Sequence, residues 1–186
     1  IEPLNHRGPD GEGVSLFKSK NAIIGFGHKR LSIIDLSQTG KQPMALNHLQ
    51  ITYNGEIYNY KEIKNELLEL GHHFSGESDT EMILHAYAEW GIKAVERFIG
   101  MFAFALYDEK KKEVVFVRDR AGVKPLFYYQ KNDLILFSSE LKSFHEHPEF
   151  KKKLDLNAVA AYMQYGYVPT PHCIFKNCAK IKPGYY

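Results

Sequence analysis

Five residues of this chain carry groups that could hold and activate a small zwitterion: Arg30, Asn54, Gly55, Glu56 and Asp79. A guanidinium group binds a carboxylate through two parallel hydrogen bonds, and carboxylates can hold an ammonium group. An amide side chain and a glycine backbone N–H can both donate to an oxygen on which negative charge develops during acyl transfer. The set therefore matches the two charged ends and the polar side chain of a free amino acid.

Each of these residues also has an ordinary structural explanation. Asn-Gly is a frequent turn sequence, Arg30 could be a surface cation, and Asp79 could simply cap a helix. For Asn54-Gly55 alone the turn is the better interpretation, because short motifs often occur by chance. The complete set is harder to attribute to structure alone.

Strands and helices are expected on both sides of these residues. Two segments rich in Ile and aromatic residues, Ala22–Phe26 and Gln50–Tyr53, are predicted strands, so several of the polar residues should follow strand ends. The apolar spacing of Tyr60–Leu70, followed by a glycine, predicts an amphipathic helix. Ser78-Asp79-Thr80-Glu81 has the spacing of a capping box and predicts a second helix that ends at Gly91.

The middle of the chain predicts a layered fold. Met101–Tyr107 is apolar on both alternating faces, which is typical of a strand in an inner sheet. Glu113–Val117, Leu126–Gln130 and Leu134–Ser138 are expected to follow it as an antiparallel meander, and Ser139–His145 as a helix. Helices and strands in this order favour an α+β sandwich over alternating βαβ units.

The character of the chain changes near residue 150. Asp155 can cap a helix over Leu156–Tyr165, and three prolines then mark an extended tail. We therefore expect one domain at 1–150 and, at 151–186, a helix and tail that lead toward a further domain. Because the chain begins with Ile rather than Met, we also expect the native protein to start further upstream.

Composition excludes several classes of function. The chain has 186 residues and a net charge of +2, so its electrostatics do not favour nucleic acid as a partner. No apolar stretch is long enough to cross a bilayer and no signal peptide is recognisable, so we expect a cytoplasmic protein that does not contact membranes. The spacing of its 9 His and 2 Cys matches no zinc motif, and no glycine-rich phosphate loop is present. We expect neither a metal nor a cofactor in this domain.

The two cysteines, Cys173 and Cys178, lie in the proline-rich tail, where we interpret them as structural or incidental thiols. His172 adjoins Cys173, but neighbouring residues of an extended segment point to opposite faces.

Six motifs together resemble the class II glutamine amidotransferase domain of glutamine-hydrolysing asparagine synthetases. The resemblance covers essentially the whole chain. The motifs lie at His6–Gly11, His28–Asp35, Tyr53–Asn59, Ser78–Glu81, Gly100–Ala105 and Arg118–Leu126.

The resemblance implies a fold and a set of roles. The fold would be a four-layer αββα sandwich of two antiparallel sheets, as in N-terminal-nucleophile hydrolases. Arg30 would bind the carboxylate of glutamine, and Leu31, Ile33 and Ile34 would line its pocket. Asn54 and Gly55 would form the oxyanion hole. Glu56 and Asp79 would hold the ammonium group, and His6–Gly11 would serve as scaffold.

The resemblance also implies parts that these residues do not include. The family nucleophile is an N-terminal cysteine, which would lie upstream of Ile1. ATP and Mg²⁺ would belong to a synthetase domain in cis, and the amidation acceptor would be aspartate or another carboxylate. A non-catalytic glutamine-binding or docking domain without the nucleophile is the alternative, as is a scaffold whose pocket no longer binds glutamine. A homodimer is left open.

Overall fold

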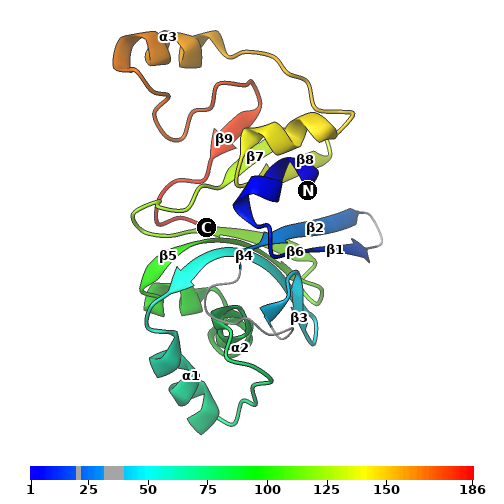
Figure 1. The fold of residues 1–186 in the computed structure, drawn as a ribbon, viewed down its shortest axis with the longest axis vertical. Helices are drawn as coiled ribbons and strands as arrows, with labels where there is room; N and C mark the ends of the chain where they lie inside the picture. The colour runs from blue at the N-terminus through cyan, green and yellow to red at the C-terminus, as the bar shows by residue number, and fades with distance from the viewer. Residues whose placement is uncertain (20–21, 32–39) are drawn as a thin grey trace.

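The computed structural model describes residues 1–19, 22–31 and 40–186 of the chain. Figure 1 shows the fold, and η denotes a 3-10 helix in the text. In chain order the elements are η1 (Glu2–Arg7), β1 (Gly11–Lys18), β2 (Ile23–Arg30), β3 (Met44–Leu46), β4 (Leu49–Ile57), α1 (Tyr60–Glu69), α2 (Asp79–Trp90), η3 (Gly91–Arg97), β5 (Gly100–Asp108), β6 (Glu113–Arg118), β7 (Phe127–Lys131), β8 (Leu134–Ser138), η4 (Leu141–Glu146), α3 (Leu156–Tyr165) and β9 (Cys178–Lys180).

The described strands pair antiparallel throughout. β3, β4, β5 and β6 form a four-stranded sheet in that order, β1 and β2 form a hairpin, and β7 lies between β8 and β9. In the central pair of the four-stranded sheet, Asn54 lies opposite Ala103 and Gly55 opposite Phe102. The expected α+β class with antiparallel sheets is confirmed.

Three apolar clusters lie between successive layers. The largest joins α1 and α2 to one face of the four-stranded sheet and includes Leu67, Ile83 and Phe104. A second cluster joins the opposite face of that sheet to the β1–β2 hairpin and β8, where Phe26 packs on Phe137. The third lies between the β7 sheet and η4. The order is therefore helices, sheet, a second β layer and a helical segment, as Figure 1 shows from α1 to η4.

Both helices before β5 form as the sequence predicts. The α1 helix is amphipathic and ends just before Gly71, and α2 begins after its N-cap, Ser78, and ends at Gly91. The capping box itself is incomplete. Ser78 Oγ accepts from the Thr80 N–H at 3.1 Å, but the Glu81 carboxylate accepts from the N–H groups of Ser75 and Gly76 instead of turning back to Ser78.

The strand predicted at Met101–Tyr107 is confirmed as the core of β5, which has a neighbour on each side and a covering layer on each face. The meander predicted after it is confirmed in the antiparallel β5–β6 and β7–β8 pairs and wrong between β6 and β7. β6 pairs with β5, whereas β7 belongs to another sheet. The crossing between them is organised by Asp119, whose carboxylate accepts from the backbone N–H groups of Ala121, Val123 and Lys124.

Several element boundaries also differ from expectation. β2 extends to Arg30 and β4 to Ile57, so the polar residues expected after strand ends lie within strands. The helix expected at Ser139–His145 is the short 3-10 helix η4. The strands β1, β3 and β9 carried no signal that the sequence analysis recognised.

The C-terminal segment folds back onto the preceding residues. Asp155 Oδ1 accepts from the Asn157 N–H and caps α3 as predicted. β9 then pairs with β7, with Cys178 opposite Tyr129, and the Arg118 guanidinium donates to the carbonyl of Ile181 at 2.7 Å. Residues 151–186 thus supply an edge strand to a sheet that begins before residue 150.

Candidate active site

A cavity of about 540 Å³ lies between the four-stranded sheet and the second β layer. Arg30, Asn54, Gly55 and Asp79 all contribute to its wall, although they come from β2, β4 and the start of α2. Four of the five residues singled out for their chemistry therefore converge on one space. A cavity of this volume is large enough for a free amino acid.

The open edge of β4 presents backbone donors to this cavity. Tyr53 N–H donates to Gln42 Oε1 at 2.7 Å, and Ile57 N–H donates to Asp79 Oδ2 at 3.2 Å. Both N–H groups point away from β5, toward the other edge of β4. β3 pairs with that edge only as far as Ile51, so no described strand pairs with the edge from there onward. Because alternate N–H groups of a strand point to the same side, the N–H of Gly55 faces this open edge, midway between the two.

The amide of Asn54 adds a second donor at the same place. Its Nδ2 atom is buried and has no hydrogen-bond partner, although the residue contributes to the cavity wall. A buried donor without a partner costs about 1–3 kcal/mol, and such groups are rare outside functional sites. The Asn54 amide is thus available for a ligand oxygen.

Close packing explains why residue 55 is glycine. A Cβ atom there would lie 2.2 Å from the carbonyl oxygen of Met101 and 2.6 Å from the Cα of Phe102. Any side chain would push β4 away from β5. The glycine therefore allows the strand pairing that fixes its own N–H and the neighbouring Asn54.

Asp79 lies at the start of α2 with its carboxylate held from two sides. Its Oδ2 accepts from the Tyr53 hydroxyl at 2.6 Å as well as from the Ile57 N–H. Desolvation by burial raises the pKa of Asp79, and these two hydrogen bonds counteract the rise. An ammonium group bound beside the carboxylate would lower that pKa again, so the site favours a cationic ligand group.

Arg30 is the last residue of β2 and is fixed through its backbone. Its carbonyl accepts from the Asp10 N–H at 3.0 Å, and a Cβ atom on Gly8 would lie 2.4 Å from the Lys29 carbonyl. The turn that follows η1 thus packs directly against the end of β2. This is the scaffold role expected for His6–Gly11.

The remaining predicted residues differ in their placement. Leu31 is exposed and contributes to the cavity wall, whereas Ile33 and Ile34 lie outside the described residues. Glu56 is half-buried and is not part of the cavity wall. Its charge raises the pKa of Asp79, so it lies close to that carboxylate.

Polar residues that the sequence analysis missed support the site. Gln42 is buried and joins two elements, because its Oε1 accepts from Tyr53 N–H while its Nε2 donates to Thr80 Oγ1 at 3.2 Å. His28 also contributes to the cavity wall, and burial together with the Arg30 charge lowers the pKa of His28 to about 4. His28 is therefore neutral at physiological pH. His28 begins the His28–Asp35 motif but was given no role, and no local motif marks Gln42.

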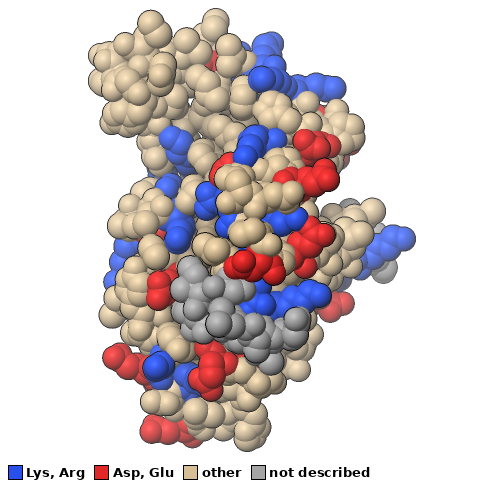
Figure 2. Space-filling model, viewed as in Figure 1, with Lys and Arg blue, Asp and Glu red and all other residues tan. Residues whose placement is uncertain are grey.

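The described residues contain no cluster of three or more His, Cys, Asp or Glu that could hold a metal ion. Cys178 begins β9 and Cys173 lies in the segment before it, and neither is part of the cavity wall. In the part of the chain that the structure covers, no helix is long and apolar enough to cross a bilayer. The surface in Figure 2 shows basic and acidic side chains interspersed rather than gathered by sign.

Comparison of the sequence with protein families and curated proteins identifies relatives. Residues 1–186 match the model of the glutamine amidotransferase domain. The chain is 41% identical to a putative glutamine-hydrolysing asparagine synthetase 2 of Methanocaldococcus jannaschii, over 96% of this chain and 38% of the relative. It is 39% identical to the glutamine-hydrolysing asparagine synthetase 3 of Bacillus subtilis, over 99% of this chain and 30% of the relative. The chain thus spans between 30% and 38% of the length of these relatives.

Comparison with solved structures supports the fold. The glutamine phosphoribosylpyrophosphate amidotransferase of B. subtilis, complexed with ADP and GMP, superposes with a TM-score of 0.65 at 22% identity. The match covers 77% of this chain and 38% of that one. The layered architecture is therefore shared with that amidotransferase.

Proposed function

This chain belongs to the glutamine amidotransferase domain family, and we propose that it hydrolyses glutamine within a larger asparagine-synthetase-like enzyme. One observation carries the proposal: the Asn54 amide and the Gly55 N–H border one cavity together with Arg30 and Asp79. That arrangement offers a cation for the α-carboxylate, an anion for the α-ammonium and two donors for an oxyanion.

Each part of glutamine has a proposed partner. The Arg30 guanidinium binds the α-carboxylate in a bidentate pair. Asp79, with Glu56 close behind it, holds the α-ammonium. Leu31, and in our proposal Ile33 and Ile34, border the aliphatic part of the substrate. The side-chain carboxamide then extends toward Asn54 and Gly55.

The oxyanion forms where those two donors meet. A cysteine thiolate attacks the carboxamide carbon, and the C=O electron pair moves onto oxygen. The Asn54 Nδ2–H and the Gly55 N–H donate to that oxygen. The oxyanion then collapses, the C–N bond breaks, and ammonia leaves with the proton that the thiol had released on forming the thiolate. Water then releases glutamate from the thioester. We assign the thiolate to an N-terminal cysteine of the native protein, since neither Cys173 nor Cys178 borders the cavity.

We further propose a synthetase domain in the same polypeptide as the consumer of ammonia. The relatives are more than twice the length of this chain, which leaves room for such a domain. ATP and Mg²⁺ belong there in this proposal, and aspartate is the acceptor. We keep the division of this chain near residue 150, with 151–186 leading toward that domain, as part of the same proposal.

Glutamate formation by the full-length protein tests the proposal. We expect glutamine-dependent release of glutamate and ammonia that is abolished when the N-terminal cysteine is replaced by alanine. Calorimetry with glutamine on that cysteine variant should still show binding, because the cavity does not depend on the thiol. Binding without hydrolysis in the unmodified protein would instead identify a glutamine-binding or docking domain. Absence of binding would refute the pocket assignment.

A further inference from the structure

A pair of thiols lies at the beginning of β9 and in the segment before it, outside the candidate site. Cys173 is 3% exposed and Cys178 is half-buried, and both are free thiols. They bracket a tight turn in which the Cys178 N–H donates to the carbonyl of Phe175 at 3.3 Å. Neither thiol has a role in the proposed hydrolysis of glutamine.

The backbone places the two thiols face to face. Lys180 N–H donates to the carbonyl of Pro171 at 2.9 Å, which closes the base of the turn. Cys173 follows Pro171 by two residues, and Cys178 precedes Lys180 by two residues. The two cysteines therefore occupy directly opposite positions across the turn. The two thiols also lie close enough to shift one another's pKa.

The turn is anchored on both sides. Cys178 is paired with Tyr129 of β7, while the Asp155 N–H donates to the carbonyl of Ile174 at 3.0 Å. Lys176 N–H donates to the carbonyl of Lys153 at 2.8 Å. The cysteines are thus held at the point where the segment before α3 meets β9, and their approach does not depend on a flexible loop.

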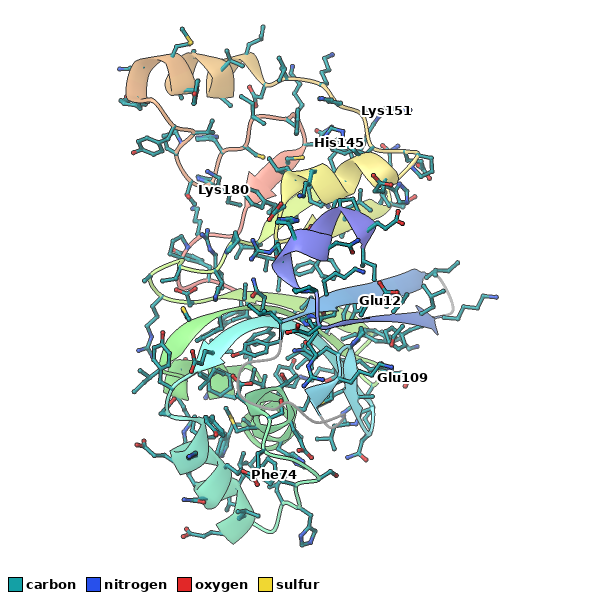
Figure 3. The ribbon with its side chains drawn as sticks, in the orientation of Figure 1. Glu12, Phe74, Glu109, His145, Lys151 and Lys180 are labelled. Carbon is teal, nitrogen blue, oxygen red and sulfur yellow. The ribbon has the colours of Figure 1, made fainter. Side chains whose placement is uncertain are left out.

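The surroundings differ between the two sulfurs. The Cys173 thiol lies near the Cys178 thiol, the backbone N–H groups of Phe175 and Ile174 and the ammonium of Lys180, which Figure 3 labels on β9. The Cys178 thiol, followed by these backbone N–H groups, lowers the pKa of the Cys173 thiol against the opposing effect of burial. The same contact raises the pKa of Cys178.

We propose that Cys173 and Cys178 form a redox-active dithiol, an oxidation site at which a small peroxide converts the pair into an intrachain disulfide. The oxidant is small because Cys173 is almost fully covered, which hinders attack on a bulky disulfide. The site is separate from the amidotransferase cavity and does not rest on the proposed function.

The chemistry balances in two steps. The Cys173 thiolate attacks one peroxide oxygen and the O–O bond breaks, which leaves a sulfenic acid on Cys173 and releases hydroxide that becomes water. The Cys178 sulfur then attacks the sulfenic sulfur, the S–S bond forms, and a second water leaves with the thiol proton. The two thiols lose two electrons, which the peroxide gains. A dithiol reductant reverses the reaction.

Peptide mass spectrometry on the full-length protein tests the inference. Lys176 lies between the two cysteines, so trypsin separates them into two peptides that only a disulfide can hold together. After brief exposure to hydrogen peroxide and alkylation of the remaining thiols, we expect one linked species containing both peptides. Treatment with dithiothreitol should separate it. The readout is a peptide mass, so oxidation of a catalytic cysteine elsewhere does not affect it.

Two variants assign the roles of the sulfurs. Cys178→Ser should trap Cys173 as a sulfenic acid that reacts with a dione probe. In Cys173→Ser, Cys178 should be oxidised more slowly than Cys173 is in Cys178→Ser, because the backbone N–H groups of Phe175 and Ile174 and the Lys180 ammonium favour the thiolate at Cys173. Two results would overturn the proposal. In the first, both cysteines remain fully alkylatable although the peroxide has oxidised a reference cysteine peptide in the same tube. In the second, the disulfide forms only between two protein molecules. The measurement on the unmodified protein stands even where a variant fails to fold.

Discussion

The Tyr53 hydroxyl donates a hydrogen bond of 2.6 Å to the carboxylate of Asp79, and this bond joins the inner strand β4 to the start of α2. Both residues are almost fully buried. The carboxylate that is proposed to hold the substrate ammonium is therefore oriented by the strand that carries the proposed oxyanion donors. Tyr53 acts as a positioning residue, because its hydroxyl is committed to Asp79.

Removing that hydroxyl should shift the pH dependence of glutamine binding. Burial raises the pKa of Asp79 and the Tyr53 bond lowers it, so Tyr53→Phe should raise that pKa further. Since only the ionised carboxylate attracts an ammonium group, the pH below which KM rises should move upward. We expect KM at mildly acidic pH to increase roughly tenfold, which corresponds to about one pKa unit.

The exposed tyrosine Tyr58 provides a matched control for this experiment. Tyr58→Phe should leave both KM and its pH profile unchanged. If the profile of Tyr53→Phe coincides with that of the unmodified enzyme, then Asp79 does not bind the substrate in its ionised form.

Replacing the proposed side-chain donor of the oxyanion hole should affect turnover. Loss of one such donor costs about 2.7–4 kcal/mol of transition-state stabilisation in comparable sites, so Asn54→Ala should lower kcat by at least tenfold. KM should change little, because the ground-state carbonyl carries less charge. Asn65→Ala on the exposed face of α1 is the control and should behave as the parent enzyme. Normal turnover in Asn54→Ala would exclude the assigned role.

The carboxylate partner can be examined through substrate discrimination. Arg30→Ala should raise KM for glutamine, whereas Arg30→Lys should restore part of the affinity, since lysine keeps the charge but loses the bidentate geometry. The informative comparison uses a glutamine analogue without the α-carboxylate. The unmodified enzyme should discriminate strongly against it and Arg30→Ala only weakly. Equal discrimination by both would show that Arg30 does not contact the carboxylate.

An ion-pair cluster away from the cavity makes stability depend on pH. Glu140 accepts from His6 at 2.9 Å and from Arg7 at 3.0 Å, which ties η1 to the residue before η4. Burial would raise the pKa of Glu140, but the bonds from His6, Arg7 and Lys142 outweigh it and lower that pKa to about 2. The stabilisation is therefore complete above the ordinary carboxyl pKa of 4.5 and lost as the pH falls toward 2.

Thermal unfolding of Glu140→Gln checks this dependence. The variant should unfold at a lower temperature than the parent at neutral pH, by an amount that corresponds to about 1 kcal/mol or less because the cluster is partly exposed. The difference should shrink as the pH approaches 3. Glu149→Gln, an exposed acidic residue whose side chain makes no recorded ion pair in the described structure, serves as control. A difference that stays constant with pH would mean that Glu140 acts through packing rather than charge.

Local motifs predicted the two helices before β5 better than they predicted strand ends. At Asn54-Gly55 the sequence favours a turn, yet the pairing of Gly55 with Phe102 keeps the chain extended. Tertiary pairing overrides the local preference here, because glycine has no Cβ atom that would clash with the backbone of β5. Four of the five residues border one cavity, while the turn favoured at Asn54-Gly55 does not form.

Gln42 could not be found from the sequence for a different reason. Its two hydrogen bonds reach Tyr53 and Thr80, which belong to separate elements, so the role exists only once β4 and α2 are assembled. Likewise, Glu81 satisfies the spacing of a capping box but turns to the loop at Ser75. The spacing of residues along a sequence indicates which contacts are possible. Which of these contacts forms depends on the other hydrogen-bond partners nearby in the folded protein.

The return of the C-terminal segment onto β7 matters to anyone who wishes to express a minimal version of this protein. Ending the chain near residue 150 would leave the whole β7 edge without its partner and remove the Ile181 carbonyl that receives the Arg118 guanidinium. Uncovered strand edges recruit other strands, so such a shortened protein should self-associate.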